Sequence, residues 1–351
     1  MDRVKKDILT LANADTRTVK FVDRTFNADR ARARELWCFI LEKRASGEIP
    51  AGVRFHFEIA GELLDEESLT LLSGAPRGLF QMEIGLQSFH APTLRAISRA
   101  PISERLLGSI SRLVELGNIH IHIDLIAGLP LEDLSTFRAG FDRAYRLGAH
   151  MLQLGFLKLL HGAPMREQAE KYPCTYEKDS PYTVTSTPSL SADDLAEIAL
   201  CEEGCERLYN SGKYKRTLSA ALANGGSPYA LLRDAGAALS TLPPAYTLDD
   251  EVRLLFDFFA EHLSRDRARD LLLWDFLATN PSCYTPKALR REDGSLARVK
   301  ARLETLYPRK KDCRRAYAIL YTEGCAAFAD YGEKDPISGE YPVFQCSLQE
   351  V

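Results

Sequence analysis

The stretch that decides the fold is "HIHIDLIAGLP", residues 120–130. Residues 120–125 alternate between polar and apolar, which is typical of a β-strand, and a tight Gly-Pro turn follows. Isoleucines and a leucine occupy one side of this strand, and His120, His122 and Asp124 occupy the other. The fold depends on whether that polar side faces water or lines the interior of a closed structure.

Segments of strand and helix character alternate through the first half of the chain. The five strand-like segments lie at 18–27, 54–64, 78–88, 118–130 and 150–162, with helix-like segments between them. This alternation predicts a parallel sheet, because parallel neighbours need a crossover and the crossover is usually a helix. All-parallel sheets are covered on both faces, so the polar side of 120–125 is not expected to face bulk water.

A polar stripe recurs on the other strand-like segments. His56 and Glu58 share one side of their strand, and Glu83 and Gln87 share one side of the next. An open, doubly wound sheet would be apolar on both faces, whereas a barrel with a polar interior alternates on every strand. We therefore predict an α/β fold that forms a partial (β/α) barrel of parallel strands. The side chains expected to converge on one polar pocket are Glu58, Glu83, Gln87, His122 and Asp124.

The second half of the chain changes character. An irregular stretch covers 163–190, and helix patterns follow at 191–212, 229–240, 249–263, 265–278 and 294–305. The tail beyond residue 314 predicts a pair of strands around a loop. We expect two domains, the partial barrel at 1–221 and a mainly helical domain at 222–351.

Composition limits the classes of function. The chain has 351 residues with a formal net charge of −4, so nothing in it favours nucleic acid or an anionic membrane as a partner. No apolar run is long enough to span a bilayer, and the first residues resemble a polar amphipathic helix rather than a signal peptide. We expect a cytoplasmic location.

The cysteines and histidines offer few metal sites. The eight cysteines are scattered, and only Cys201 and Cys205 are close, on adjacent turns of a predicted helix without a third ligand nearby. His120 and His122 form a His-x-His pair like that of metal-dependent barrel hydrolases, which is an alternative function. The pair lies in mid-strand, however, and few other histidines accompany it.

Two quoted segments carry a family resemblance. "EIGLQSFHAPTLRAISR" (83–99) and "DLIAGLP" (124–130) resemble the radical S-adenosylmethionine (SAM) superfamily. With "VKFVDRTFN", "FHFEIAGELL", "LQLGFLKLLHG" and "YNSG", the chain is similar to its cobalamin-associated branch, whose C-terminal domain has no assigned function. The resemblance covers most of residues 1–220.

The resemblance implies a site for SAM at the strand ends. In such barrels the fourth and fifth strands contact the ribose and adenine, and the end of the second strand contacts the methionine part. Carboxylates suit the ribose hydroxyls and the ammonium group, and small residues allow close backbone approach. The expected cofactor-binding residues are Arg24, Glu58, Glu83, Gln87, Ser88, Asp124 and Gly128.

One departure limits this reading. The family's Cys-x3-Cys-x2-Cys motif, whose thiolates hold a 4Fe–4S cluster, is absent from the 351 residues. In the intact family, SAM is cleaved to a 5′-deoxyadenosyl radical or a cobalamin-borne methyl group is transferred. This chain resembles the C-terminal portion without the first strand, the cysteine loop and the cobalamin domain. It is expected to bind neither cluster nor cobalamin and to be inactive alone.

Two further expectations follow from a missing first strand. The chain is either part of such an enzyme or a non-catalytic remnant or subunit that needs an N-terminal half in trans. The strand at 18–23 becomes an edge of the sheet, and it is expected to present Val19 and Phe21 to solvent.

Overall fold

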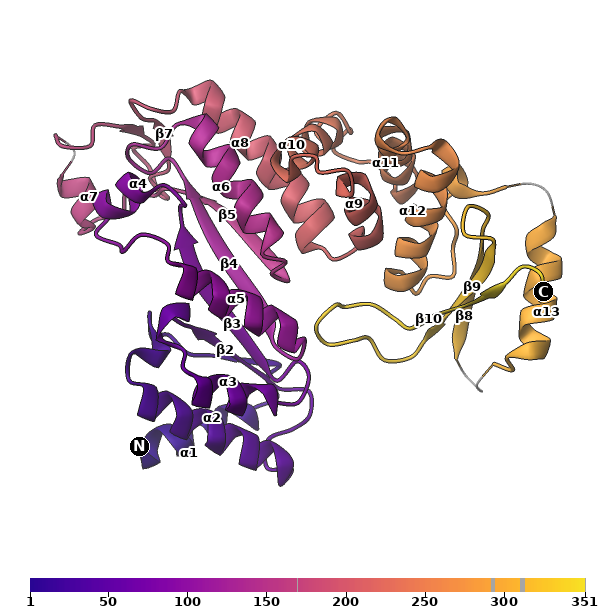
Figure 1. Ribbon diagram of the computed structural model, residues 1–351, viewed down its shortest axis with the longest axis horizontal. Helices are drawn as coiled ribbons and strands as arrows, with labels where there is room; N and C mark the ends of the chain where they lie inside the picture. The colour runs from indigo at the N-terminus through magenta and orange to yellow at the C-terminus, as the bar shows by residue number, and fades with distance from the viewer. Residues whose placement is uncertain (169, 292–293, 310–312, 351) are drawn as a thin grey trace. The chain divides into compact units, whose positions relative to one another are not determined.

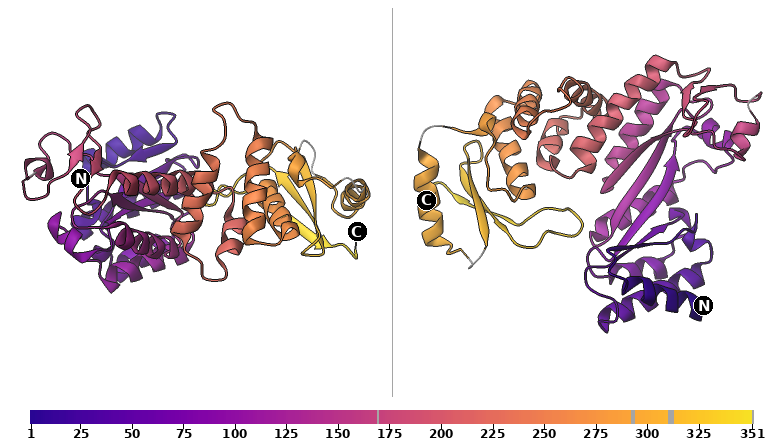
Figure 2. Two further views of the ribbon diagram at one scale, coloured as in Figure 1. Left: turned by 90° about the horizontal axis from the view of Figure 1, so that it is seen from above. Right: turned by 180° about the vertical axis from the view of Figure 1, so that it is seen from behind.

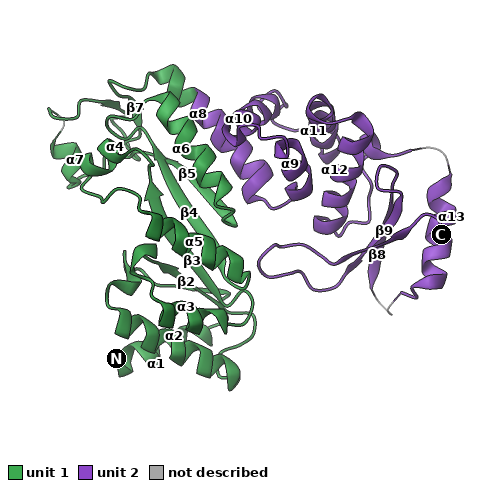
Figure 3. Cartoon of the chain, in the orientation of Figure 1, with its two compact units in different colours: residues 1–196 green, residues 197–351 purple. Residues whose placement is uncertain are grey.

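The structure is a computed structural model that describes residues 1–168, 170–291, 294–309 and 313–350 (Figure 1). The chain divides into two compact units, Met1–Ala196 and Glu197–Val351 (Figure 3). The division lies within helix α8 (Ala192–Gly204), earlier than the predicted boundary near residue 222. The end of α8 packs on the next helices of unit 2, a contact that a continuous helical pattern in the sequence does not reveal. The assignment of domains stays a prediction.

The described part of unit 1 contains one five-stranded parallel sheet in the order β1-β2-β3-β4-β5. Its strands are β1 (Thr18–Lys20), β2 (Arg54–Glu58), β3 (Phe80–Gln87), β4 (His120–Ala127) and β5 (Met151–Phe156). Sequential order without reversal means that every crossover turns the same way, as in a (β/α) barrel and unlike a doubly wound sheet. The predicted α/β fold class and all five predicted strands are confirmed.

The helices of unit 1 connect these strands. They are α1 (Asp2–Ala12), α2 (Arg30–Ala45), α3 (Glu66–Ser73), α4 (Ala91–Ala96), α5 (Glu104–Leu116) and α6 (Leu134–Arg146). Short polar side chains begin four of them: each N-cap accepts a hydrogen bond from a backbone N–H of the first turn, as the sequence pattern requires. These N-caps are Asp29, Asp65, Ser103 and Asp133.

The sheet has one apolar and one polar face. Along β3 buried and half-buried residues alternate without exception, with Phe80, Met82, Ile84 and Leu86 in the core. Right-handed crossovers that all turn the same way put the helices on the apolar face, and the strands are seen directly from behind (Figure 2). At the centre of the polar face, His56 and His122 are buried. At its edge, Gln153 on β5 is exposed to water. The prediction concerned His120, His122 and Asp124, and these side chains are buried or half-buried.

Strand β1 is an edge, paired in the sheet with β2 alone among the described residues. The prediction that it presents Val19 and Phe21 to solvent is wrong. Val19 is only 6% exposed, and Phe21 stacks on Phe57 with ring centroids 4.7 Å apart. The apolar residue that is exposed near this strand is Val22, with 91% of its surface accessible to solvent.

The stretch 163–190 contains α7 (Pro164–Glu167) and a short hairpin of β6 (Thr175–Tyr176) and β7 (Val184–Ser186). The described part of unit 2 is mainly helical. Its elements are a π-helical turn (Cys205–Asn210), α9 (Lys215–Leu222), α10 (Pro228–Leu239), α11 (Leu248–His262), α12 (Arg265–Thr279), α13 (Ser295–Leu306), β8 (Arg314–Leu320), β9 (Cys325–Tyr331) and β10 (Val343–Ser347).

The predicted strand pair of the tail is present as β8 and β9, and β10 adds a third antiparallel strand. In the described ranges, no helix is both long enough and apolar enough to cross a lipid bilayer.

Candidate functional site

Two rows of polar side chains cross the polar face of the sheet. The register aligns Glu58 with Glu83 and Glu83 with His122 on β2, β3 and β4. Lys20 aligns with His56 in the neighbouring row. Because adjacent strands lie about 4.8 Å apart, side chains in one row contact each other directly.

Glu83 is the electrostatic centre of this face. His56 Nε2 lies 2.9 Å from Glu83 Oε2, and Lys20 Nζ lies 3.6 Å from the same oxygen. Burial acts to raise the pKa of Glu83, but His122, Lys20 and His56 outweigh it and hold that pKa below its usual value. Burial, together with Lys20, lowers the pKa of His56. The contact is therefore a neutral imidazole that donates its Nε2–H to an ionised carboxylate.

His122 and Asp124 form a second, unsatisfied pair on β4. His122 Nε2 lies 2.9 Å from Asp124 Oδ1, which is the distance of an ion pair. Both atoms are buried, yet neither has a hydrogen-bond partner in the described structure. The two atoms are close, but they are not aligned for a hydrogen bond. Each can therefore still form a hydrogen bond with another group.

A cavity of about 390 Å³ opens at the carboxyl ends of β2 and β3. Its charged lining groups are Arg24, Glu58, Glu62 and Arg99, and Arg99 Nη1 donates to the Gly85 carbonyl oxygen at 3.0 Å. Burial first, and then the charges of Glu83 and Asp124, raise the pKa of Glu58. We call this the strand-end cavity. Part of its wall comes from residues 98–103, between α4 and α5, and from Leu106 in α5.

A bulge at the end of β3 shapes the floor of this cavity. The pairing with β4 shifts between Gly85 and Gln87, and Gln87 has a left-handed backbone with φ of 66°. A Cβ atom placed on Gly85 would collide with the Gln87 side-chain amide, so that amide lies over the glycine. That amide is the end of a flexible side chain, so a Cβ atom at 85 would displace it.

Ser88 does not reach the strand-end cavity. It is buried, donates to Glu132 Oε1 at 2.6 Å and accepts from the His90 backbone N–H at 2.9 Å. Glu132 is 1% exposed, and its Oε2 has no partner in the described structure. Burial raises the pKa of Glu132 to about 7. Ser88 and Glu132 thus form a buried pair between two strand ends.

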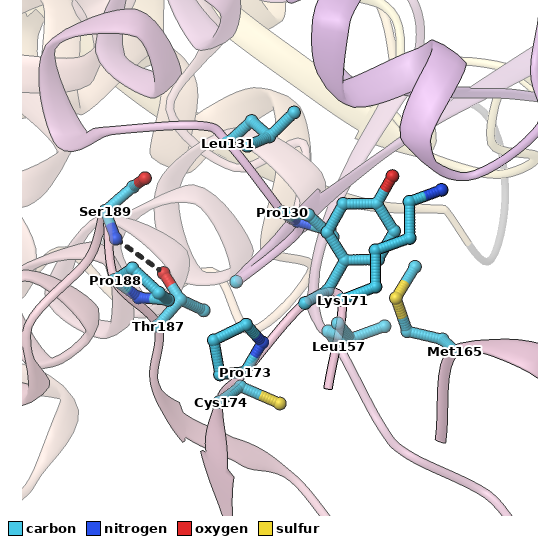
Figure 4. Close-up of a pocket in the computed structure, with 12 residues that line it drawn as sticks. Pro130, Leu131, Leu157, Met165, Lys171, Pro173, Cys174, Thr187, Pro188 and Ser189 are labelled. Carbon is cyan, nitrogen blue, oxygen red and sulfur yellow. Dashed lines mark hydrogen bonds between the residues drawn. The ribbon is translucent and has the colours of Figure 1, made fainter. Parts of the chain in front are cut away.

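Gly128 lines a separate cavity of about 90 Å³ at the ends of β4 and β5. Figure 4 shows Met165 and Lys171 from the 163–190 stretch reaching over Leu157, with Cys174 nearby. This volume is smaller than the range of about 300–1,000 Å³ that is typical of small-molecule sites.

The structure therefore distributes the predicted site residues among different surroundings. Arg24 and Glu58 line the strand-end cavity; Glu83, Gln87 and Asp124 lie on the adjoining polar face; and Ser88 and Gly128 lie elsewhere. The carboxylates of Glu58, Glu83 and Asp124 lie near enough to interact electrostatically, and their convergence on one pocket stays a prediction. Arg99 was missed as a lining residue, although it closes the quoted "TLRAISR" segment.

In the described part of the chain, no three His, Cys, Asp or Glu side chains are grouped to hold a metal ion. His120 packs against His150, with ring centroids 5.2 Å apart. Cys201 and Cys205 are both buried, and burial raises the pKa of the Cys205 thiol well above its usual value. A buried thiol with a raised pKa is a poor metal ligand.

Residues 170–317, fewer than half of the chain, match the profile of a family described only as a protein of unknown function (DUF4080). No curated protein matches the chain.

Solved structures match at low identity. The radical SAM methyltransferase TsrM from Kitasatospora setae, with its tryptophan substrate and a SAM analogue bound, is 22% identical over 48% of this chain and 33% of its own, with a TM-score of 0.42. Coproporphyrinogen III oxidase (HemN) from Escherichia coli, a radical SAM enzyme, is 18% identical over 56% of this chain and 43% of its own, with a TM-score of 0.42. Elp3 from Methanocaldococcus infernus is 16% identical over 48% of this chain and 44% of its own, with a TM-score of 0.36. The chain spans less than half the length of each of these.

Proposed function

We propose that unit 1 binds S-adenosylmethionine in the strand-end cavity and that the chain serves as the C-terminal portion of a radical SAM protein. The observation that carries the proposal is a cavity of about 390 Å³ at the carboxyl ends of β2 and β3, lined by two carboxylates and two guanidinium groups. Parallel (β/α) folds bind ligands at this end of the strands. The volume lies within the range of small-molecule sites, about 300–1,000 Å³.

The lining groups complement SAM. Glu58 suits its ammonium group or ribose hydroxyls, and Arg24 and Arg99 suit its carboxylate, because guanidinium groups bind carboxylates with two hydrogen bonds. Ile84 and the backbone at Gly85 offer an apolar wall and close approach for the adenine. When bound, SAM supplies an activated sulfonium group, and the residues named here position it.

The protonation of Glu58 makes the proposal pH-dependent. Its pKa is raised by burial and by the nearby carboxylates, and the protonated form cannot pair with a cation. A sulfonium or ammonium group beside Glu58 favours the ionised form. SAM affinity is therefore expected to rise as the pH rises through the titration of Glu58, and binding releases a proton.

The residues of this chain do not fit the family's iron–sulfur cluster. The described part groups no three metal-binding side chains, and we derive no redox or cobalamin step. We propose that a complementary N-terminal half supplies the cluster cysteines and adds a strand to the free edge of β1. The substrate is left unassigned, a cytoplasmic setting is proposed, and no nucleic acid or membrane is proposed as a partner.

Equilibrium binding of SAM, measured by calorimetry, tests the proposal. We expect Glu58→Gln and Arg99→Gln to weaken binding by about tenfold or more, the loss of one hydrogen bond to a charged group. Glu115→Gln, at an exposed site on α5 outside the cavity, is the matched control and should bind as the parent does. S-adenosylhomocysteine, which lacks the sulfonium charge, should bind more weakly than SAM. Absence of binding at about 1 mM SAM, or equal affinities of all three variants, refutes the proposal.

The alternative of a metal-dependent hydrolase is not proposed. His120 is packed against His150, His122 is paired with Asp124, and no third ligand joins them in the described residues.

A further inference from the structure

Unit 2 contains a cavity of about 360 Å³ that the proposed function does not use. It lies between α12, the segment 283–291, the start of α13 and strand β8, all labelled in Figure 1 or adjoining labelled elements. We call it the arginine cavity, because its charged lining groups are Arg269, Arg290 and Arg291. No acidic side chain lines it in the part of the chain that the structure describes.

Arg269 is built into the wall. It is 8% exposed, its Nε donates to the Leu289 carbonyl oxygen at 3.0 Å, and its Nη1 donates to Asp270 Oδ1 at 2.6 Å. Asp270 is itself held by the backbone N–H of Thr322 at 2.7 Å. Removing a guanidinium group from water is unfavourable, so burial of Arg269 beside the cavity lowers the stability of the fold. Its hydrogen bonds hold it there in a fixed orientation.

The other two arginines stand at the rim. Arg291 pairs with Asp266. Arg290 donates its Nε to the Thr285 carbonyl oxygen at 2.8 Å and interacts electrostatically with Asp249. Glu292 and Asp293, which follow in the sequence, lie outside the described residues. The charged side chains that line the cavity among the described residues are all arginines.

Aromatic rings orient these guanidinium groups. The Arg269 and Arg291 guanidinium carbons lie 5.5 Å and 4.3 Å from the Tyr321 ring centroid, and that of Arg290 lies 4.9 Å from the Tyr284 ring centroid. Cation–π contact fixes the plane of a guanidinium group while its N–H edge stays available. Leucine, isoleucine and alanine side chains add apolar surface to the wall, beside Thr285, Ser295 and Tyr317.

We propose that the arginine cavity binds a small molecule that joins an anionic group, a carboxylate or a phosphate ester, to an apolar or planar body. Guanidinium groups bind both anions through paired N–H bonds, and the apolar wall accepts the body. The volume suits a small molecule, and the inference does not rest on SAM binding by unit 1.

The test uses the full chain and the fluorescent anion 1-anilinonaphthalene-8-sulfonate, which carries one anionic group on planar rings. We expect one saturable site whose affinity falls about tenfold or more in Arg290→Gln, because an exposed arginine at the cavity rim is removed. Arg267→Gln, at an exposed site on α12 outside the cavity, is the matched control. Far-ultraviolet circular dichroism checks that both variants are folded.

Competition identifies the anion. Displacement of the fluorescent probe by phenyl phosphate alone assigns a phosphate ester, and displacement of the probe by benzoate assigns a carboxylate. Neutral benzyl alcohol at the same concentration should not displace the probe. Equal binding by parent and Arg290→Gln overturns the proposal, as does displacement by benzyl alcohol. Binding of a single-stranded RNA that depends on Arg290, with no displacement by either small anion, also overturns it in favour of a macromolecular surface.

Discussion

Replacing Glu132 with glutamine is expected to stabilise unit 1 above pH 7 and to change its stability little at pH 5. The carboxyl group is 1% exposed, one of its oxygens accepts from Ser88 at 2.6 Å, and the other has no partner in the described structure. Glutamine keeps the acceptor for Ser88 and removes the buried charge. It therefore mimics the protonated form of the native residue.

The magnitude follows from the pKa of Glu132. Burial raises it from 4.5 to about 7. Between these values the folded state holds a proton that the unfolded state has released, so the free energy of unfolding falls as the pH rises through this window. At about 1.4 kcal/mol per pKa unit, the loss is of the order of 3 kcal/mol when Glu132 is fully ionised. Glu132→Gln should recover most of it at pH 8.

Urea unfolding at pH 5 and pH 8 measures the effect. The chain has two tryptophans, and in a Trp274→Phe background the fluorescence of the buried Trp37 reports unit 1 alone. Glu115→Gln is the control for the loss of one exposed carboxylate. A Glu132→Gln variant that is destabilised equally at both pH values, or a parent whose stability does not fall between them, would refute this account.

Three further outcomes are expected. Gly204→Ala should destabilise unit 2 by about 1–3 kcal/mol in urea unfolding, because its Cβ would overlap the Leu232 backbone carbonyl, which cannot move aside. Gly108→Ala, at an exposed position on α5 with open space around the new methyl group, should instead stabilise unit 1 by up to about 1 kcal/mol, and a loss there would contradict the reasoning. The free edge of β1 and the exposed Val22 should make the chain self-associate, with Val22→Lys reducing the effect in light scattering; a monodisperse parent chain would show that the edge is harmless.

The polar stripe was predictable because a strand repeats every two residues. His56, Glu58, Glu83, His122 and Asp124 do share one face of the sheet, as simple counting along each strand requires. Counting failed where the chain departs from this period. The bulge at Gly85 and Gln87 inserts a residue, and no local pattern in "EIGLQS" marks it.

The sequence by itself determined the α/β class, the five parallel strands and the polar side of each, since these follow from short-range periodicity and from helix-capping residues beside the segments they begin. Only the tertiary structure decided which groups meet. It paired Ser88 with Glu132 across 44 residues and removed Ser88 from the strand-end cavity. It also placed Arg269 against the Ile319 carbonyl oxygen across 50 residues to form the arginine cavity. Such contacts depend on the register and packing of distant elements, and no window of neighbouring residues encodes them.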